Sequence, residues 1–353
     1  MKILRVLLAA LSATVVSMAA PGWTVPNAQQ PQLSATADGT VWLVYGQNGS
    51  IFAAESVDGG TSFQAAQQVG ELHDLSFGMR RGPRIAAKGD RVTVAVMGEE
   101  LLAYSSGDRG KTWTGPVTIN DVPASAKEGL HDLAIAPDGK LFVVWLDQRE
   151  GPMELWGAES TDGGKSWAAN QRIYRSPEKS ICECCHPSAL FDADGNLAVM
   201  WRNSLGGSRD LWMAVRSRGT ATFSGAKKLG TGTWPLDACP MDGGRILALG
   251  SGKFGSVWQR AGEVYFAIPG ESEVRLGKGR QPIATVRGDK PTVFWQDGTD
   301  LVGTTLGSPG GPTKEAANAR FAAVATTTSG TTVLVYERPG ASGESTNLVV
   351  QRR

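Results

Sequence analysis

The chain has 353 residues, and its 35 lysines and arginines nearly balance its 34 aspartates and glutamates, giving a formal net charge of +1. This balance leaves no basic surplus for a nucleic-acid or membrane-surface partner, so the sequence argues against both classes of protein. The 45 glycines and 18 prolines favour many short strands joined by tight turns.

The N-terminal segment has the pattern of a secretory signal peptide. Lys2 and Arg5 precede an apolar stretch over residues 6–16, and a small-x-small cleavage site follows directly. The apolar stretch is too short to span a bilayer, and no cysteine follows the cleavage site, so we expect no membrane anchor. We therefore predict that residues 1–19 are removed, that the protein is exported to the periplasm or the extracellular space, and that residues 20–353 form a single domain.

Short β-rich runs that end in an aromatic residue or Met, followed by polar residues, recur along the chain. Most of them follow an apolar segment and an Asp-Gly turn, which indicates two antiparallel strands joined by a tight turn. Two further strands complete each unit, and radially repeated units of four strands are typical of an all-β fold, the β-propeller. There are seven such runs, which favour seven blades over the alternative of six: residues 41–45, 92–97, 141–145, 197–201, 254–258, 292–295 and 331–336.

Two segments near the ends of the chain need a separate interpretation. The last unit contains three evident strands, and residues 22–26 (Gly-Trp-Thr-Val-Pro) resemble an isolated outer strand. We expect this segment to complete the final blade, because closing the ring removes exposed sheet edges. Residues 308–318 are polar and loosely patterned, and we predict a long loop there within the same domain.

One short motif occurs three times at nearly constant spacing, with its aspartate at Asp58, Asp108 and Asp162. Each copy has the form Ser-x-Asp-x-Gly-x-Ser/Thr-aromatic and follows a short apolar strand. Asp can accept hydrogen bonds from the amides of a tight turn, and Gly supplies a positive φ, so each copy predicts a hairpin turn. At these residues the chain resembles the Asp-box (BNR) repeat of sialidase-like β-propellers. The resemblance implies a propeller whose boxes are structural and lie on the face opposite the active site.

All histidines and cysteines of the chain precede predicted first strands of blades. In a propeller these positions face one end of the central axis, so we expect the side chains to converge there. Met241 follows the last cysteine and provides a further soft ligand. The residues that we predict at this axial mouth are His73, His131, Cys182, Cys184, Cys185, His186 and Cys239, with Met241 beside them.

Three interpretations of this Cys/His cluster compete. An even number of cysteines in an exported protein is typical of disulfides, for example between Cys239 and one cysteine of the 182–185 group. Thiolates with imidazoles are also suitable ligands for Cu(I) or Zn(II). The third interpretation is a redox-active thiol pair. Taken alone, His73 and His131 are as well explained as hydrogen-bonded structural residues.

The resemblance to sialidases has its own implications for catalysis. Members of that family bind the substrate carboxylate with three arginines, whose forked guanidinium groups match a carboxylate. They use a Tyr activated by a Glu as nucleophile and an Asp as acid/base. Arg84 lies in Gly-Pro-Arg-Ile-Ala, which matches the family's Arg-Ile-Pro element in part and lacks its Pro. The resemblance implies these candidates: Arg84, Arg202 and Arg338 for the carboxylate, Tyr336 with Glu337 as nucleophile pair, and Asp132 as acid.

The sequence thus supports three function hypotheses. The first is an exported Asp-box propeller with a Cys/His site for Cu or Zn, or with a disulfide-supported ligand site. The second is a sialidase-like exo-glycosidase that acts on terminal sugars. The third is a non-catalytic propeller that binds a glycan or a protein. In each case the polar residues that follow the second strands favour a small polar ligand or a glycan as partner.

Overall fold

A computed structural model describes residues 23–71, 78–340 and 345–353, and every regular element in these ranges is a β-strand. The predicted signal peptide and His73 lie outside the described residues. Because the described ranges contain no helix, they contain none that is long and apolar enough to cross a membrane. The described strands form seven four-stranded antiparallel sheets, so the predicted propeller and its seven blades are confirmed.

The blades follow one another in chain order. Blade 1 consists of β2 (Gln29–Ala35), β3 (Val41–Gln47), β4 (Ser50–Ser56) and β5 (Gln67–Glu71). Blade 2 consists of β6 (Arg84–Lys88), β7 (Arg91–Met97), β8 (Leu101–Ser106) and β9 (Thr114–Thr118). Blade 3 consists of β10 (His131–Ile135), β11 (Leu141–Asp147), β12 (Glu154–Ser160) and β13 (Gln171–Tyr174). Blades 4 and 5 consist of β14 (Ser188–Phe191), β15 (Leu197–Arg202), β16 (Leu211–Arg216) and β17 (Lys227–Lys228); and β18 (Arg245–Ala248), β19 (Phe254–Arg260), β20 (Glu263–Ala267) and β21 (Val274–Lys278). Blade 6 consists of β22 (Arg280–Arg287), β23 (Lys290–Asp297), β24 (Asp300–Thr305) and β25 (Thr313–Ala316). Blade 7 consists of β26 (Arg320–Thr326), β27 (Thr332–Pro339), β28 (Thr346–Arg352) and β1 (Thr24–Val25).

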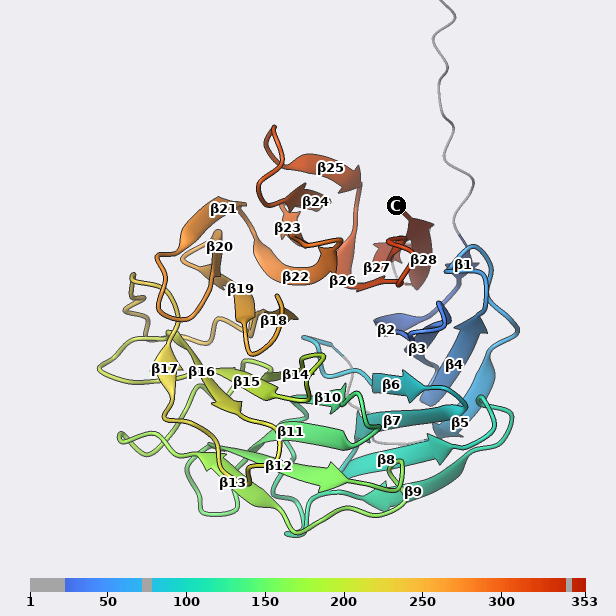
Figure 1. Cartoon of the computed structure of the whole chain (residues 1–353), viewed down its shortest axis with the longest axis horizontal. Coiled ribbons are helices and arrows are strands. Elements are labelled where there is room, and N and C mark those ends of the chain that lie inside the picture. Colours follow the sequence, from blue (N-terminus) through green and yellow to red (C-terminus); the bar gives the residue numbers. More distant parts are fainter. Residues whose placement is uncertain (1–22, 72–77, 341–344) are drawn as a thin grey trace, which may run out of the picture.

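The first strands of the blades surround the central axis. Each of them contacts the first strand of the next blade, from β2 through β6, β10, β14, β18 and β22 to β26, and β26 contacts β2 again. The ring is therefore closed, and Figure 1 shows the blades radiating from this centre.

The ring is closed by the N-terminal strand, as predicted. β1 pairs with β28, with Thr24 opposite Val349 and Val25 opposite Leu348. Next to this strand, Trp23 stacks on Phe63 of blade 1 with 5.1 Å between ring centroids. The N-terminal segment thus supplies the outer edge strand of blade 7 and also contacts blade 1.

The core lies in the sheets and between adjacent blades. The aromatic residue or Met predicted near the end of each second strand is buried in all seven blades, with at most 3% of its surface exposed. These side chains are Tyr45, Met97, Trp145, Trp201, Trp258, Trp295 and Tyr336.

The region predicted as a long loop, residues 308–318, contains the outer strand β25 instead. Most of β25 is exposed or half-buried and its sequence, Thr-Lys-Glu-Ala, has no apolar alternation. An outermost strand that packs on one neighbour only carries little of the hydrophobic pattern from which strands are predicted.

The three Asp boxes are turns between the third and fourth strands of blades 1 to 3. In the first box, Asp58 Oδ1 accepts hydrogen bonds from the amides of Thr61 (3.0 Å) and Ser62 (2.9 Å), and Ser56 Oγ accepts one from the amide of Gly60 (2.8 Å). Gly60 has a φ of 85°, and a Cβ there would lie 2.5 Å from Val333 of blade 7. The box therefore holds its own turn and packs tightly against the preceding blade.

The antiparallel order of each blade separates two faces of the ring. The box turns, which join third and fourth strands, lie on one face. The connections that lead into the first strands, together with those that follow the second strands, lie on the other face. All cysteines of the chain belong to connections of this second face, which we call the mouth.

Candidate functional site

The Cys-Glu-Cys-Cys-His-Pro segment lies at the mouth, between β13 and β14. The amide of Ile181 donates a hydrogen bond to Met153 O (3.0 Å), and the amide of Cys182 donates one to Arg202 O (3.1 Å). The first bond ties the segment to blade 3 and the second to β15 of its own blade. The start of the segment is therefore fixed on two sides before the other cysteines follow.

Three thiol groups of this segment converge. Cys182 Sγ lies 3.7 Å from Cys184 Sγ and 3.6 Å from Cys185 Sγ, and the three sulfur atoms all lie within 4.8 Å of one another. A metal–sulfur bond of about 2.3 Å places two sulfur ligands of a tetrahedral ion about 3.8 Å apart. A disulfide requires about 2.05 Å between its sulfur atoms. The two separations are those of hydrogen-bonded thiols, they are close to the spacing of adjacent metal ligands, and they do not match a disulfide.

All four cysteines belong to the described residues, and all four are free thiols. The structure therefore contains no disulfide between Cys239 and the three-thiol group, which was one of the expected arrangements. Cys239 is exposed on the connection that leads into β18 and is not a member of the group. Convergence at the mouth is thus obtained for three of the four cysteines.

The connection that leads into β18, the first strand of blade 5, packs against the three-thiol group and holds it in place. The amide of Asp242 donates a hydrogen bond to Cys185 Sγ (3.3 Å). A Cβ on the next residue, Gly243, would lie 1.8 Å from the carbonyl oxygen of His186, so only glycine permits this approach. Blade 5 therefore determines the position of Cys185 through backbone contacts.

The pKa values of the three thiols are shifted in different directions. Hydrogen bonds from Cys184 and Cys185, together with the charge of Arg202, hold the pKa of Cys182 well below its usual range. Burial raises the pKa of Cys185, and hydrogen bonding to the other two thiols raises that of Cys184. Cys182 is therefore the thiol of the group whose pKa its neighbours lower.

Arg202, a predicted carboxylate ligand, lies behind this group. It is 1% exposed, and its guanidinium donates to the carbonyl oxygens of Asp242 (3.1 and 2.8 Å), Arg209 (2.6 Å) and Gln259 (2.9 Å). Among the residues that the structure describes, no carboxylate lies within ion-pair distance of it. Its charge instead lowers the pKa of Cys182 and Cys185. Arg202 thus supports the thiolate electrostatically.

The predicted histidines and Met241 take other positions. His186 Nε2 is hydrogen-bonded to Gly244 O (3.1 Å), and burial together with nearby arginines lowers its pKa well below the usual value. His131 is buried with its ring nitrogens near Gly129 O (3.2 Å) and Ala95 O (3.3 Å), and burial lowers its pKa to about 4. Neither imidazole belongs to the three-thiol group. Met241 is half-buried.

A second centre lies on the axis itself. Arg80, Arg84 and Arg245 line a small cavity together with His186 and with residues of the first strands of blades 1, 6 and 7. Asp132 pairs with two of these arginines, since Arg245 Nη1 lies 2.9 Å from Asp132 Oδ2 and Arg84 Nε lies 3.6 Å from Oδ1. Two guanidinium groups thus share one carboxylate, while the third, that of Arg80, interacts electrostatically with Asp242 and Glu337.

Arg84 and Arg80 are held differently within this centre. Arg84 is 3% exposed, and its Nε has no hydrogen-bond partner although it is buried. Arg80 donates from Nε to Gln281 Oε1 (2.5 Å) and has a left-handed backbone with a φ of 65°. Burial lowers the pKa of both arginines to about 10.

The two centres are connected through one residue. Asp242, whose amide reaches Cys185, accepts a hydrogen bond from the amide of Gln281 at its Oδ2 (2.6 Å). Gln281 in turn accepts from Arg80. Asp242 Oδ1 has no partner, and burial raises the pKa of this carboxyl.

The sequence analysis missed Arg80 and Arg245. A signal for Arg245 was present, because Arg84, His131 and Arg245 are each the first residue of a first strand. An alignment of the seven units on that position would have grouped them. Arg80 lies outside any strand, and no repeat pattern marks it.

The remaining glycosidase candidates lie in blade 7. Arg338 Nη2 donates to the hydroxyl of Tyr336 (3.0 Å), which is buried in the blade. Glu337 is 2% exposed, accepts a hydrogen bond from the amide of Gln30 (2.8 Å) and pairs with Arg320. Tyr336 and Glu337 are consecutive in β27, so their side chains point to opposite faces of the sheet. The structure brings Arg84 to Asp132 and Arg338 to Tyr336, in two separate groups.

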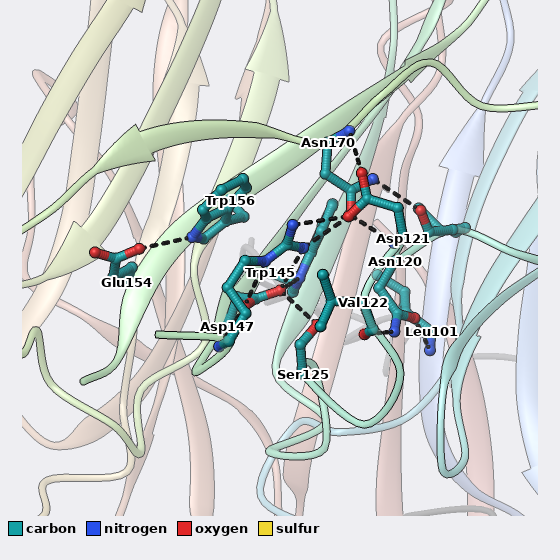
Figure 2. Close-up of polar contacts among 12 residues, drawn as sticks. Leu101, Asn120, Asp121, Val122, Ser125, Trp145, Asp147, Glu154, Trp156 and Asn170 are labelled. Carbon is teal, nitrogen blue, oxygen red and sulfur yellow. Dashed lines mark hydrogen bonds and ion pairs between the residues drawn. The ribbon is translucent and has the colours of Figure 1, made fainter. Parts of the chain in front are cut away.

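Another polar group at the mouth is satisfied internally. Asp147, which is fully buried at the end of β11, binds Arg149 through both of its oxygens (3.0 and 2.9 Å). Asp147 also accepts hydrogen bonds from Ser125 Oγ and Trp145 Nε1, both at 2.8 Å. Figure 2 shows this network joining the loop before blade 3 to β11 and to Asn170. Its donors and acceptors are paired, so it serves the fold.

Comparisons with known proteins address the fold. No protein-family profile matches the sequence, and no curated protein matches it. Several solved structures, however, match this chain in fold. YCF48 bound to a D1 peptide matches with a TM-score of 0.56 and 13% identity, over 96% of this chain and 99% of that one.

Two intramolecular trans-sialidases are similar as well. The leech enzyme, complexed with 2,7-anhydro-Neu5Ac, matches with a TM-score of 0.51 and 12% identity, over 96% of this chain and 70% of that one. The Ruminococcus gnavus enzyme, in complex with oseltamivir carboxylate, matches with a TM-score of 0.50 and 13% identity, over 92% and 94%. At this level of identity the likeness concerns the fold alone: the chain is a seven-bladed β-propeller with the sialidase-like architecture.

Proposed function

We propose that this protein is an exported propeller that binds one thiophilic metal ion, Cu(I) or Zn(II), at Cys182, Cys184 and Cys185. The observation that carries the proposal is the separation of the sulfur atoms, 3.7 and 3.6 Å, in a group that a neighbouring blade braces. Export is inferred from the N-terminal signal pattern.

The donor set favours Cu(I) over Zn(II). Soft thiolates select Cu(I), whereas structural zinc sites have four protein ligands. The group has three thiols, and no imidazole or carboxylate of the described residues belongs to it. Arg202 offsets part of the negative charge that three thiolates bring to a buried position.

The test is metal stoichiometry of the purified, reduced protein. We expect about one Cu(I) per chain in anaerobic competition with a coloured chelator, as the single three-thiol group requires. Cys182→Ser and Cys185→Ser should abolish this binding. Cys239→Ser is the matched control, because that thiol is outside the group, and it should bind like the wild type. Equal binding by all three variants, or no binding of copper or zinc by the wild type, would contradict the proposal.

A second candidate function is binding of an acidic ligand at the axial arginines. The buried Nε of Arg84, which lies 3.6 Å from Asp132 Oδ1 but makes no hydrogen bond, and the sharing of Asp132 with Arg245 favour an additional anionic group at this place. Similar propellers are described with a sialic-acid derivative or a peptide, and both ligand classes carry carboxylates. Calorimetric titration with N-acetylneuraminic acid tests this candidate. Arg245→Met should weaken binding, whereas Arg275→Met, in the exposed outer strand of blade 5, should not.

A sialidase-like activity has its own readout, although Tyr336 and Glu337 lie in blade 7, apart from Arg84 and Asp132. Turnover of a fluorogenic sialoside that Tyr336→Phe abolishes would establish an exo-glycosidase. Binding without turnover on a broad glycoside panel would establish a non-catalytic glycan-binding propeller.

A further inference from the structure

The three thiols of the proposed metal site differ in their access to solvent. Cys182 and Cys185 are each 1% exposed, whereas Cys184 between them is half-buried and follows the exposed Glu183. The site therefore has two fully buried ligands and a third, Cys184, that is partly accessible.

The two inner ligands are fixed by the fold. The backbone of Cys182 is bonded to β15 through Arg202 O, and the sulfur of Cys185 is bonded to the backbone of Asp242 in blade 5. The close approach of Gly243 to His186 leaves no room for this part of the segment to move toward blade 5. Any change of ligand at the metal must therefore take place on the side of Cys184.

The three thiols also leave one position of a tetrahedral ion without a protein ligand. Within the described residues the group consists of three ligand atoms, without a fourth from His, Cys, Asp or Glu. His186 is the next residue but one after Cys184, and its Nε2 is bonded to Gly244 O while its ring lines the axial cavity. Closed four-ligand thiolate sites are typical of structural zinc, whereas an open position admits an external ligand.

From this asymmetry we infer that the site is a transfer site. It exchanges a thiophilic ion directly with a carrier that has soft sulfur ligands, and the exchange takes place beside Cys184. A sulfur atom of the carrier occupies the open position, metal–sulfur bonds to the carrier break as bonds to the three thiolates form, and the thiol protons pass to solvent. The oxidation state of the metal does not change. This inference rests on the proposed metal binding.

The experiment measures how fast a competitor removes Cu(I) from the loaded protein. The protein is charged with one equivalent of Cu(I) under anaerobic conditions, and bicinchoninate is mixed in at a series of concentrations. If the competitor attacks the open position, the initial rate rises in proportion to its concentration. If the site is closed, the rate is independent of concentration, because spontaneous release of the ion limits it.

Two variants complete the test. Cys184→Ser leaves only the two buried thiolates, so we expect it to lose Cu(I) to bicinchoninate faster than the wild type at every competitor concentration. Cys239→Ser should transfer at the wild-type rate. A wild-type rate that does not change with bicinchoninate concentration, in protein that holds one equivalent of Cu(I), would overturn the inference alone. Failure to hold copper would instead overturn the proposed function.

Discussion

The approach of Gly243 to His186 allows a sharp test of how blade 5 braces the cysteine segment. In Gly243→Ala, the new Cβ would lie 1.8 Å from the carbonyl oxygen of His186, whereas ordinary contacts begin at 3.4 Å. The two backbones must therefore separate by about 1.6 Å. Overpacking of this kind costs about 1–3 kcal/mol. For a domain of this size that lowers Tm by about 2 °C per kcal/mol.

The assay is thermal unfolding of the apo protein, followed by circular dichroism, with Gly225→Ala as control. Gly225 has open space where its Cβ would be, and its φ is outside the left-handed region, so alanine fits there. Such a replacement stabilises by about 0.4–1 kcal/mol through the unfolded state, so the two variants should shift Tm in opposite directions. Separation of the segments should also weaken the bond from Asp242 to Cys185 and reduce Cu(I) affinity. Equal Tm values for both variants would refute the reasoning.

Three further changes probe the ring and its buried charges. Asp147→Ala leaves the Arg149 guanidinium without its main partner, and we expect a loss of about 3–5 kcal/mol in urea unfolding; a smaller loss in the double variant with Arg149→Met would confirm that the stranded charge causes it. Asp162→Ala removes the acceptor of an Asp-box turn and should cost about 1 kcal/mol, as for a lost helix cap. Although burial raises the pKa of Asp162, hydrogen bonds within its turn lower that pKa to about 2. The contribution of Asp162 to the free energy of unfolding is therefore complete above about pH 4 and is lost as the pH falls toward 2. In acid unfolding, the stability difference between wild type and variant should accordingly disappear near pH 2. Val25→Asp places a charge in the buried closing strand and should cost about 2 kcal/mol or more, whereas Thr24→Asp, on the exposed side, should cost little; equal effects would argue against closure by β1.

Much of the fold could be predicted because the repeat pattern is local. The run that ends at Trp145 shows its apolar pattern and its terminal aromatic residue without reference to the rest of the chain. The hydrogen bonds to the Asp58 side chain likewise all come from within its own turn. The outer strand β25 was missed because its one-sided packing leaves little pattern in the sequence.

The candidate site could be predicted in part. The convergence of Cys182, Cys184 and Cys185 follows from their closeness along the chain and from the position of their segment before a first strand. Cys239 was expected in the same group, and the structure keeps it exposed outside the group. The connection before β18 contributes the amide of Asp242, and not the thiol of Cys239, to that group. Ring geometry predicts which connections meet, but not which side chains of them point inward.

By itself, the sequence determined the seven-unit repeat, the box turns and the segment in which the thiols gather, because each depends on residues near one another along the chain. It also indicated the closing strand, whose partner β28 lies near the other end of the chain. Only the tertiary structure decided the spacing of the sulfur atoms, the bracing by Asp242 and Gly243, and the meeting of Arg80 and Arg84 with Arg245 on the axis. The bracing joins residues 57 positions apart and Arg245 is more than 150 positions from the other two arginines. Both contacts follow from how blades pack against one another, for which no local pattern exists.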